Sequence, residues 1–136
     1  AAMIPIGTAL QTTGLSDVIS SNISLLAADM SLFWLLFLIL IITMATTDII
    51  NNAATAVIMA PISAGIGLEL GYAIEPFLMV VAVGASCAFL TPIGHQCNTV
   101  VMGPGNYKFT DYWRLGLPLD ILIIAVSIPM ILFVWT

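Results

Sequence analysis

Two short polar segments interrupt a chain that is otherwise apolar enough to lie in lipid. The first covers residues 46–52 and reads Thr-Thr-Asp-Ile-Ile-Asn-Asn; the second covers residues 91–98 and reads Thr-Pro-Ile-Gly-His-Gln-Cys-Asn. Hydrocarbon offers no hydrogen-bond partner to a bare backbone. Non-helical chain at membrane depth therefore survives only where protein buries it or where it lines a wet cavity. These two breaks constrain the fold more than any other feature of the sequence.

The composition supports a lipid environment. Of the 136 residues, 61% are hydrophobic and 7% are charged, and the mean hydropathy is +1.17. A soluble domain carries about 25% charged residues, so this chain cannot cover a water-facing surface. The net charge is −5, and with only two cationic residues the chain has no basic patch. Nucleic acid is therefore excluded as a partner. Cys87 and Cys97 match no metal or redox spacing and are expected to be packed thiols.

Paired interruptions of apolar segments are the best sequence indication of the ion and substrate site of a transporter. The pattern predicts an all-α membrane protein: one inverted repeat of a transporter, with a re-entrant helical hairpin and a broken transmembrane helix. The chain begins in the middle of a pattern, so we expect the C-terminal repeat of a longer protein. Within a single membrane domain, 1–136, we expect connector or interface helices over 1–30, a helix and hairpin with its tip at Asn51-Asn52 over 31–66, a broken helix over 75–102, an interfacial loop over 103–116 and a final transmembrane helix over 117–136.

The arms of the predicted hairpin are short. The apolar stretch over residues 31–45 falls below the roughly 20 residues of a full span. It either borrows the polar residues that follow, at an end buried in protein, or stops partway through the membrane. We expect the second arm to begin at Ala53 and to end at Pro61 and the glycines beyond it.

We expect the broken helix to run from Phe77 to about Leu90 and to resume at Asn98. The last span carries Asp120 near its start. Both cations, Lys108 and Arg114, precede that span, and the positive-inside rule places their loop in the cytoplasm and the C-terminus outside.

The first break offers ligands for a cation and for an anion. Asp48 is the only charged residue between Leu32 and Ile66, and a carboxylate at membrane depth costs about 2.5–3.5 kcal/mol on insertion scales. Asparagine side chains and freed carbonyl groups suit a hard cation such as Na⁺. The helix N-terminus after Asn52 favours an anion. A polar surface loop between two ordinary helices remains the alternative.

The second break has no formal charge. Pro92 removes a backbone donor and Gly94 relaxes the backbone, which indicates an unwound helix. His95 is either a packed, satisfied histidine or part of the site, and an ionisable residue inside a membrane favours the second interpretation.

Residues 48–56, Asp-Ile-Ile-Asn-Asn-Ala-Ala-Thr-Ala, together with residues 91–98, resemble the C-terminal half of the divalent anion–sodium symporter family. The segments 103–112 and 116–118 also resemble it. The resemblance implies two inverted repeats, each with a re-entrant hairpin and a broken helix. The family's Ser-Asn-Thr tip motif falls on residues 51–53, where Asn52 matches. The Thr-Pro-Pro-Asn stretch of dicarboxylate carriers falls on residues 95–98, where Asn98 matches. The remaining departures favour the sulfate branch.

The breaks and the resemblance together predict a secondary active transporter, not an enzyme. We expect Na⁺-coupled symport of a divalent anion, with sulfate or a related oxyanion ahead of a di- or tricarboxylate. Na⁺ acts as the coupling ion, and no other cofactor is expected. Contacts to the substrate are assigned to Asn51, Asn52, Thr55, His95 and Gln96. Ligands of Na⁺ are assigned to the side chains of Asn52 and Asn98 and to the carbonyl groups of Ile50, Ile93 and Gly94.

Three other interpretations stay open. One is a proton-coupled anion carrier with Asp48 and His95 as a proton relay. Another is a non-transport membrane subunit, and the third is a membrane enzyme that uses Asp48, His95 and Cys97. The expected partners are the lipid bilayer, a small anion, the missing N-terminal repeat and a second copy in a homodimer. The expected location is the inner membrane of a bacterium.

Overall fold

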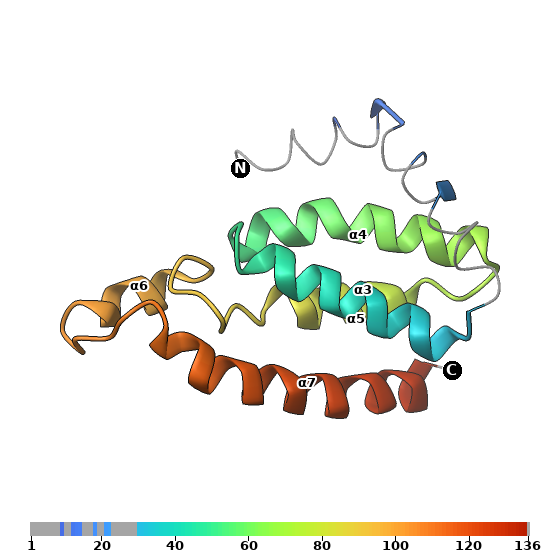
Figure 1. The fold of residues 1–136 in the computed structure, drawn as a ribbon. Helices are drawn as coiled ribbons and strands as arrows, with labels where there is room; N and C mark the ends of the chain where they lie inside the picture. The colour runs from blue at the N-terminus through green and yellow to red at the C-terminus, as the bar shows by residue number, and fades with distance from the viewer. Residues whose placement is uncertain (1–8, 10–11, 15–17, 19–20, 23–29, 136) are drawn as a thin grey trace.

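The computed structural model describes residues 9, 12–14, 18, 21–22 and 30–135, so the expected connector over 1–30 lies almost wholly outside the described part. From residue 30 onward the chain is helical (Figure 1). The helices are α3 (Leu32–Thr47), α4 (Asn52–Glu69), α5 (Glu75–Ala85), α6 (Gln96–Met102) and α7 (Asp111–Trp135). The described residues form no strand. The all-α prediction is confirmed.

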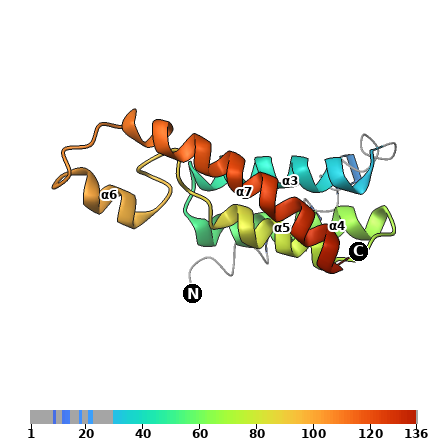
Figure 2. The same cartoon turned by 90° about the horizontal axis from the view of Figure 1, so that it is seen from below.

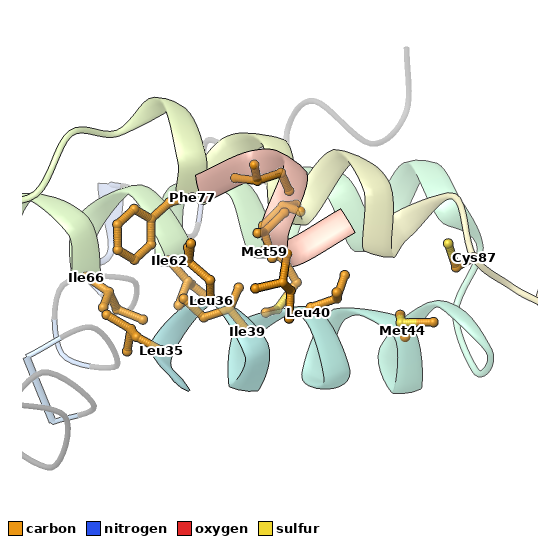
Figure 3. Close-up of a cluster of buried hydrophobic side chains, with 14 residues drawn as sticks. Leu35, Leu36, Ile39, Leu40, Met44, Met59, Ile62, Ile66, Phe77 and Cys87 are labelled. Carbon is orange, nitrogen blue, oxygen red and sulfur yellow. The ribbon is translucent and has the colours of Figure 1, made fainter. Parts of the chain in front are cut away.

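Helices α3 and α4 form a hairpin, and α5 packs against both of them. The contact is apolar because α3 consists mostly of Leu, Ile, Phe and Met and can bury whichever side meets a neighbour. Figure 3 shows α3 side chains meeting those of α4 and the Phe77 ring. The buried cluster comprises Leu35, Leu36, Ile39, Leu40, Met44, Met59, Ile62, Ile66, Phe77, Val80, Val81, Cys87, Ile128 and Ile131.

Helix α4 does not end at Pro61, and this expectation was wrong. The helix continues to Glu69 with Pro61 inside it. A proline inside a helix loses one backbone hydrogen bond. Here contacts with neighbouring helices stabilise the turns after Pro61. Ile62 and Ile66 are buried, and the Ser63 hydroxyl donates to the Phe77 carbonyl oxygen at 3.1 Å. Tertiary packing outweighs the local cost.

Helix α5 ends at Ala85, five residues before the expected Leu90, and the chain becomes helical again at Gln96 instead of Asn98. The cause lies in the hairpin. The Thr47 hydroxyl is 3.0 Å from the Ala85 carbonyl oxygen, and the Leu90 N–H donates to Asp48 Oδ1 at 3.1 Å. Groups of the first break therefore take the bonds that would have continued α5.

The final helix starts at Asp111, so it takes in the last part of the expected interfacial loop. Asp111 Oδ2 accepts a hydrogen bond from the Lys108 N–H at 2.8 Å and closes a turn at the start of α7. With 25 residues, α7 is the one described helix that is long and apolar enough to cross a membrane, whereas α3 and α5 are shorter apolar helices.

The helices are arranged so that both breaks lie at one end of the bundle. Figure 1 shows the α3–α4 turn beside the segment that leads from α5 to α6. Figure 2 shows α7 crossing α5, while α6 projects from that same end. The interface of α7 is with α5 and α3. This arrangement brings together segments that are about forty residues apart in sequence, as the hydrogen bonds below show.

Candidate functional site

The hairpin tip is built by the last turn of α3 and the first turn of α4. Asn51 is the N-cap of α4, and its Oδ1 accepts the Ala54 N–H at 2.9 Å, as an asparagine in this position commonly does. The Thr47 hydroxyl lies 2.9 Å from Asn52 Oδ1 and 3.0 Å from the Ala85 carbonyl oxygen. The Thr47 hydroxyl is therefore the one donor shared by the hairpin tip and the last residue of α5.

The second break is held by the first. Asp48 Oδ1 accepts from the Leu90 N–H, and the Asp48 carbonyl oxygen accepts from the Thr91 hydroxyl at 2.6 Å. Thr91 Oγ1 in turn accepts from the Gly94 N–H at 3.2 Å. Backbone groups that the break removes from a helix are thus satisfied by protein, as a position inside a membrane requires.

Gly94 lies where the two breaks touch. A Cβ atom at this position would lie 2.7 Å from Ala88 Cβ, 2.9 Å from the Thr47 carbonyl oxygen and 3.2 Å from Asp48 Cα. Two of these atoms belong to backbone, which cannot turn aside. Only glycine therefore allows the break to approach the tip this closely.

Asn98 folds α6 back onto the break. Its Nδ2 donates to the carbonyl oxygens of Ala88, at 2.9 Å, and Thr91, at 3.2 Å. The Asn98 carbonyl oxygen accepts from the Tyr112 hydroxyl at 2.7 Å, which ties α6 to the start of α7. Since the side-chain nitrogen is occupied, Asn98 Oδ1 is the atom left to bind a cation.

The structure places the predicted site residues in three environments. Asn52 and Asn98 are half-buried, and Gly94 is buried between the breaks. Thr55 is fully buried, so it is not on the same surface as the tip, and its hydroxyl has no partner. The exposed members at this end of the bundle are Ile50, Asn51, Ile93, His95 and Gln96.

The two residues of the predicted proton relay, Asp48 and His95, bond to different partners in the described structure. His95 Nδ1 accepts from the Cys97 N–H at 3.2 Å and caps α6, while Asp48 is bonded to Leu90 and Thr91. No direct hydrogen bond links Asp48 to His95 among the described residues. The relay stays a prediction.

Three residues of this region were not assigned a role from the sequence. Thr47 and Thr91 link the breaks, but a threonine beside a polar break gives no sign of its distant partner. Asp120 is also buried, with 7% of its surface exposed. A sequence signal did exist for Asp120, because an ionisable residue within an apolar span is a functional candidate.

The charges around the site are few. Lys108 and Arg114 are the only cations of the chain, and both are exposed on or near the α6–α7 connection. Among the residues that the structure describes, no group of three or more His, Cys, Asp or Glu gathers as for a metal ion. A cation at the breaks would thus rely on amide and carbonyl oxygens.

A short hairpin interlocked with a broken helix, beside one long apolar span, is consistent with a fragment of an all-α membrane transporter. The comparisons agree with this class. Residues 1–136 match the family described as the sodium:sulfate symporter transmembrane region, and the chain belongs to that family. Its members are integral membrane transport proteins, not enzymes. The resemblance seen in the sequence is confirmed.

Curated relatives extend the comparison. An uncharacterized transporter of Synechocystis is 38% identical over 131 residues, which is 96% of this chain and 21% of the relative. The uncharacterized transporter YfbS of Escherichia coli is 38% identical over 129 residues, 95% of this chain and 21% of the relative. The sodium/sulfate cotransporter 2 of Chlamydomonas reinhardtii is 29% identical, with 93% of this chain and 14% of the relative covered. The chain thus spans about a fifth or less of the length of these proteins.

Proposed function

We propose that the protein containing this chain couples inward movement of Na⁺ to uptake of a divalent anion, with sulfate or a related oxyanion ahead of di- and tricarboxylates. The observation that carries the proposal is the close contact of the second break with the first at Gly94. This contact joins the asparagine tip and the Asn98 region into one polar end of the helix bundle. The name of the Chlamydomonas relative, a sodium/sulfate cotransporter, supports both the ion and the anion.

The lack of a cationic side chain at the breaks supports Na⁺ coupling. The described tip and break contain neither Lys nor Arg. A dianion bound there needs positive charge, which co-bound Na⁺ supplies together with the N-terminus of α4. In this proposal, Asn52, Asn98 and the carbonyl groups of Ile50, Ile93 and Gly94 bind Na⁺.

The anion contacts in this proposal are neutral donors. Asn51, His95 and Gln96 are exposed at the polar end and can approach an anion directly, and Asn52 is shared with the Na⁺ site. Thr55 is enclosed in this structure and would reach the anion only after the hairpin moves. The Ser-Asn-Thr tip motif is retained only at Asn52, which supports an oxyanion over a dicarboxylate.

The proposal assigns this chain half of a site. The second inverted repeat of the same protein supplies the other half, and a homodimer in the inner membrane of a bacterium, with the C-terminus outside, is the working assembly. Alternating access then moves the hairpin and broken helix against a scaffold. We expect that this chain alone, in liposomes, does not transport.

The test is uptake of radiolabelled sulfate and of radiolabelled succinate by the full-length protein in proteoliposomes, with and without an inward Na⁺ gradient. We expect Na⁺-dependent sulfate uptake that Asn52→Ala abolishes, because the variant removes the side-chain oxygen at the tip. Asn106→Gly is the matched control. It removes an asparagine from a remote turn where φ is +52°, a conformation that glycine adopts freely.

Uptake that ignores the Na⁺ gradient, or an Asn52→Ala variant with normal uptake, would refute the proposal. Uptake of succinate in preference to sulfate would keep the Na⁺-coupled mechanism and overturn the choice of anion.

A further inference from the structure

Asp120 occupies the inward-facing stripe of α7. Most residues of this helix are exposed, and the buried ones are Gly116, Asp120, Ile128 and Ile131, whose spacing puts them on one side. At about 1.5 Å per residue, Asp120 lies about 13 Å along the axis from Asp111. The hydrocarbon core of a bilayer is about 30 Å thick. The carboxyl group thus lies within the span.

Asp120 has no hydrogen-bond partner for one of its oxygens. Its Oδ1 atom is buried and unpaired, a state shared among the described residues only by Asp48 Oδ2 and Thr55 Oγ1. Only 7% of Asp120 is exposed. Residues of this chain already enclose the side chain, which leaves little access for a cation from the rest of the protein.

The surroundings of Asp120 place it beside the interlocked breaks. One turn before Asp120, Gly116 packs against the segment that leads from α5 into the second break: a Cβ atom at Gly116 would lie 2.5 Å from the Phe89 carbonyl oxygen and 3.2 Å from the Leu90 nitrogen. The Leu90 N–H is the group that bonds to Asp48. The turn of α7 before Asp120 and the carboxyl group of Asp48 therefore meet at the same residue, Leu90.

The ionisable groups of the elements around α7 offer Asp120 no positive charge. The ends of α3 and α5 contribute Asp48 and Cys87, and Glu75 is exposed at the start of α5. On α7 itself, Asp111 and Tyr112 are half-buried in the first turn, and Arg114 is exposed. No described cation faces the carboxyl group. A buried carboxylate without a counter-charge is strongly unfavourable.

The two carboxyl groups differ in one respect. Asp48 Oδ1 receives the Leu90 N–H, which stabilises a negative charge, whereas the unpaired Asp120 Oδ1 has no such donor. Na⁺ would require several converging oxygens, as hard cations do. Besides Asp120 itself, only Asp48 and Thr55 provide a buried, unpaired side-chain oxygen among the described residues, and the neighbours in the stripe are a glycine and two isoleucines, so the free oxygens are too few to surround Na⁺.

We infer that Asp120 is a proton-binding site inside the membrane, distinct from the Na⁺ and anion sites, and that its carboxyl group carries a proton while α7 is packed against the second break. Loss of the proton leaves a buried charge without a partner and weakens this contact. The consequence for transport rests on the proposed function, but the presence of the proton does not.

The first experiment detects the proton directly. Dicyclohexylcarbodiimide reacts with protonated carboxyl groups in apolar surroundings, and mass spectrometry of peptides from the full-length protein locates the adduct. We expect labelling of Asp120 at neutral pH, a decrease at alkaline pH and no protection by Na⁺. Asp111 on the same helix is the internal control and should remain unlabelled. Absence of label on Asp120, or protection of it by Na⁺, would overturn the inference.

The second experiment replaces the acid by its neutral isostere. Asp120→Asn mimics the protonated carboxyl group, so we expect sulfate uptake at neutral pH to persist and its decline at alkaline pH to disappear. Asp111→Asn should keep the wild-type pH profile. An unchanged pH profile in a folded Asp120→Asn variant, or loss of uptake at every pH, would contradict the inference. If the variant does not fold, labelling of the wild-type protein decides. Uptake without Na⁺ dependence, with Asp120 still labelled, would refute only the proposed function.

Discussion

The two breaks differ in how they hold their shape. The non-helical part of the first break, residues 48–51 between α3 and α4, is a tight turn whose backbone bonds are local. The Asp48 N–H donates to the Met44 carbonyl oxygen, the Ile50 N–H donates to that of Thr46, and Asn51 caps the next helix. The non-helical segment at the second break, residues 86–95 between α5 and α6, is longer and depends on the first break for the bonds of Leu90 and Thr91. A tight turn therefore acts as the template, and a loose segment takes its shape from contact with it.

The second break depends on the first, but the first does not depend on the second. Changes at the contact between the breaks should release the second break while the hairpin survives, because the hairpin has its own turn and its arms pack against the helical part of α5, which precedes the second break. Three substitutions test this difference, in decreasing order of expected effect.

Gly94→Ala should have the largest effect. The added methyl group meets the Thr47 carbonyl oxygen and Ala88 Cβ at distances shorter than van der Waals contact, and overpacking of this kind costs about 1–3 kcal/mol. We expect a lower melting temperature in detergent and loss of most Na⁺-dependent uptake. Gly103→Ala is the control, since a Cβ there meets nothing within 4 Å. Equal behaviour of the two variants would show that the breaks need not touch.

Thr47→Val should have an intermediate effect. The change keeps the shape of the side chain but removes the hydroxyl that serves Asn52 Oδ1 and the Ala85 carbonyl oxygen. Loss of such a bond costs about 0.5–1.5 kcal/mol. We expect a higher KM for Na⁺, measured by uptake at varied Na⁺ concentration, because Asn52 loses its positioning contact. Thr46→Val provides the matched control, since the Thr46 hydroxyl only returns to the Ile42 carbonyl oxygen of its own helix. A KM shift of the same size in both variants would argue against a special role for Thr47.

Tyr112→Phe should have the smallest effect. It removes the hydroxyl that donates to the Asn98 carbonyl oxygen, at the outer edge of the second break. We expect a loss of about 0.5–1.5 kcal/mol in stability and faster hydrogen exchange confined to α6. Accelerated exchange in α3 and α4 as well would mean that the hairpin depends on the second break, contrary to the direction inferred above.

The sequence predicted the elements of the fold better than their ends. A run of Leu and Ile predicts α3 wherever it packs, and the polar letters mark both breaks. The end of α5 at Ala85 was not predictable from neighbouring residues, because its cause is Thr47, 38 positions away. The passage of α4 through Pro61 was equally hidden, since the compensating contact comes from Phe77.

The predicted site was likewise correct in part: some of its residues could be selected from the sequence, whereas the environment of others depends on distant contacts. Asn52, Asn98 and Gly94 were selected from the sequence, and the structure places all three at the interlocked end of the bundle. Thr55 was selected with them, yet it is fully buried. Thr55 lies one helical turn after Asn52, on the same side of α4, and whether that turn is enclosed or open depends on where α3 and α5 lie.

The sequence by itself determined the environment, the helical class, the position of both breaks and the family. These properties follow from the local balance of apolar and polar residues, because lipid and the backbone act on each segment separately. Only the tertiary structure decided that Asp48 bonds to Leu90 and Thr91, that Gly94 closes the contact and that Asp120 is enclosed with one oxygen unpaired. Those contacts join segments separated by a helix or more, and only the arrangement of the helices in space selects which distant groups meet.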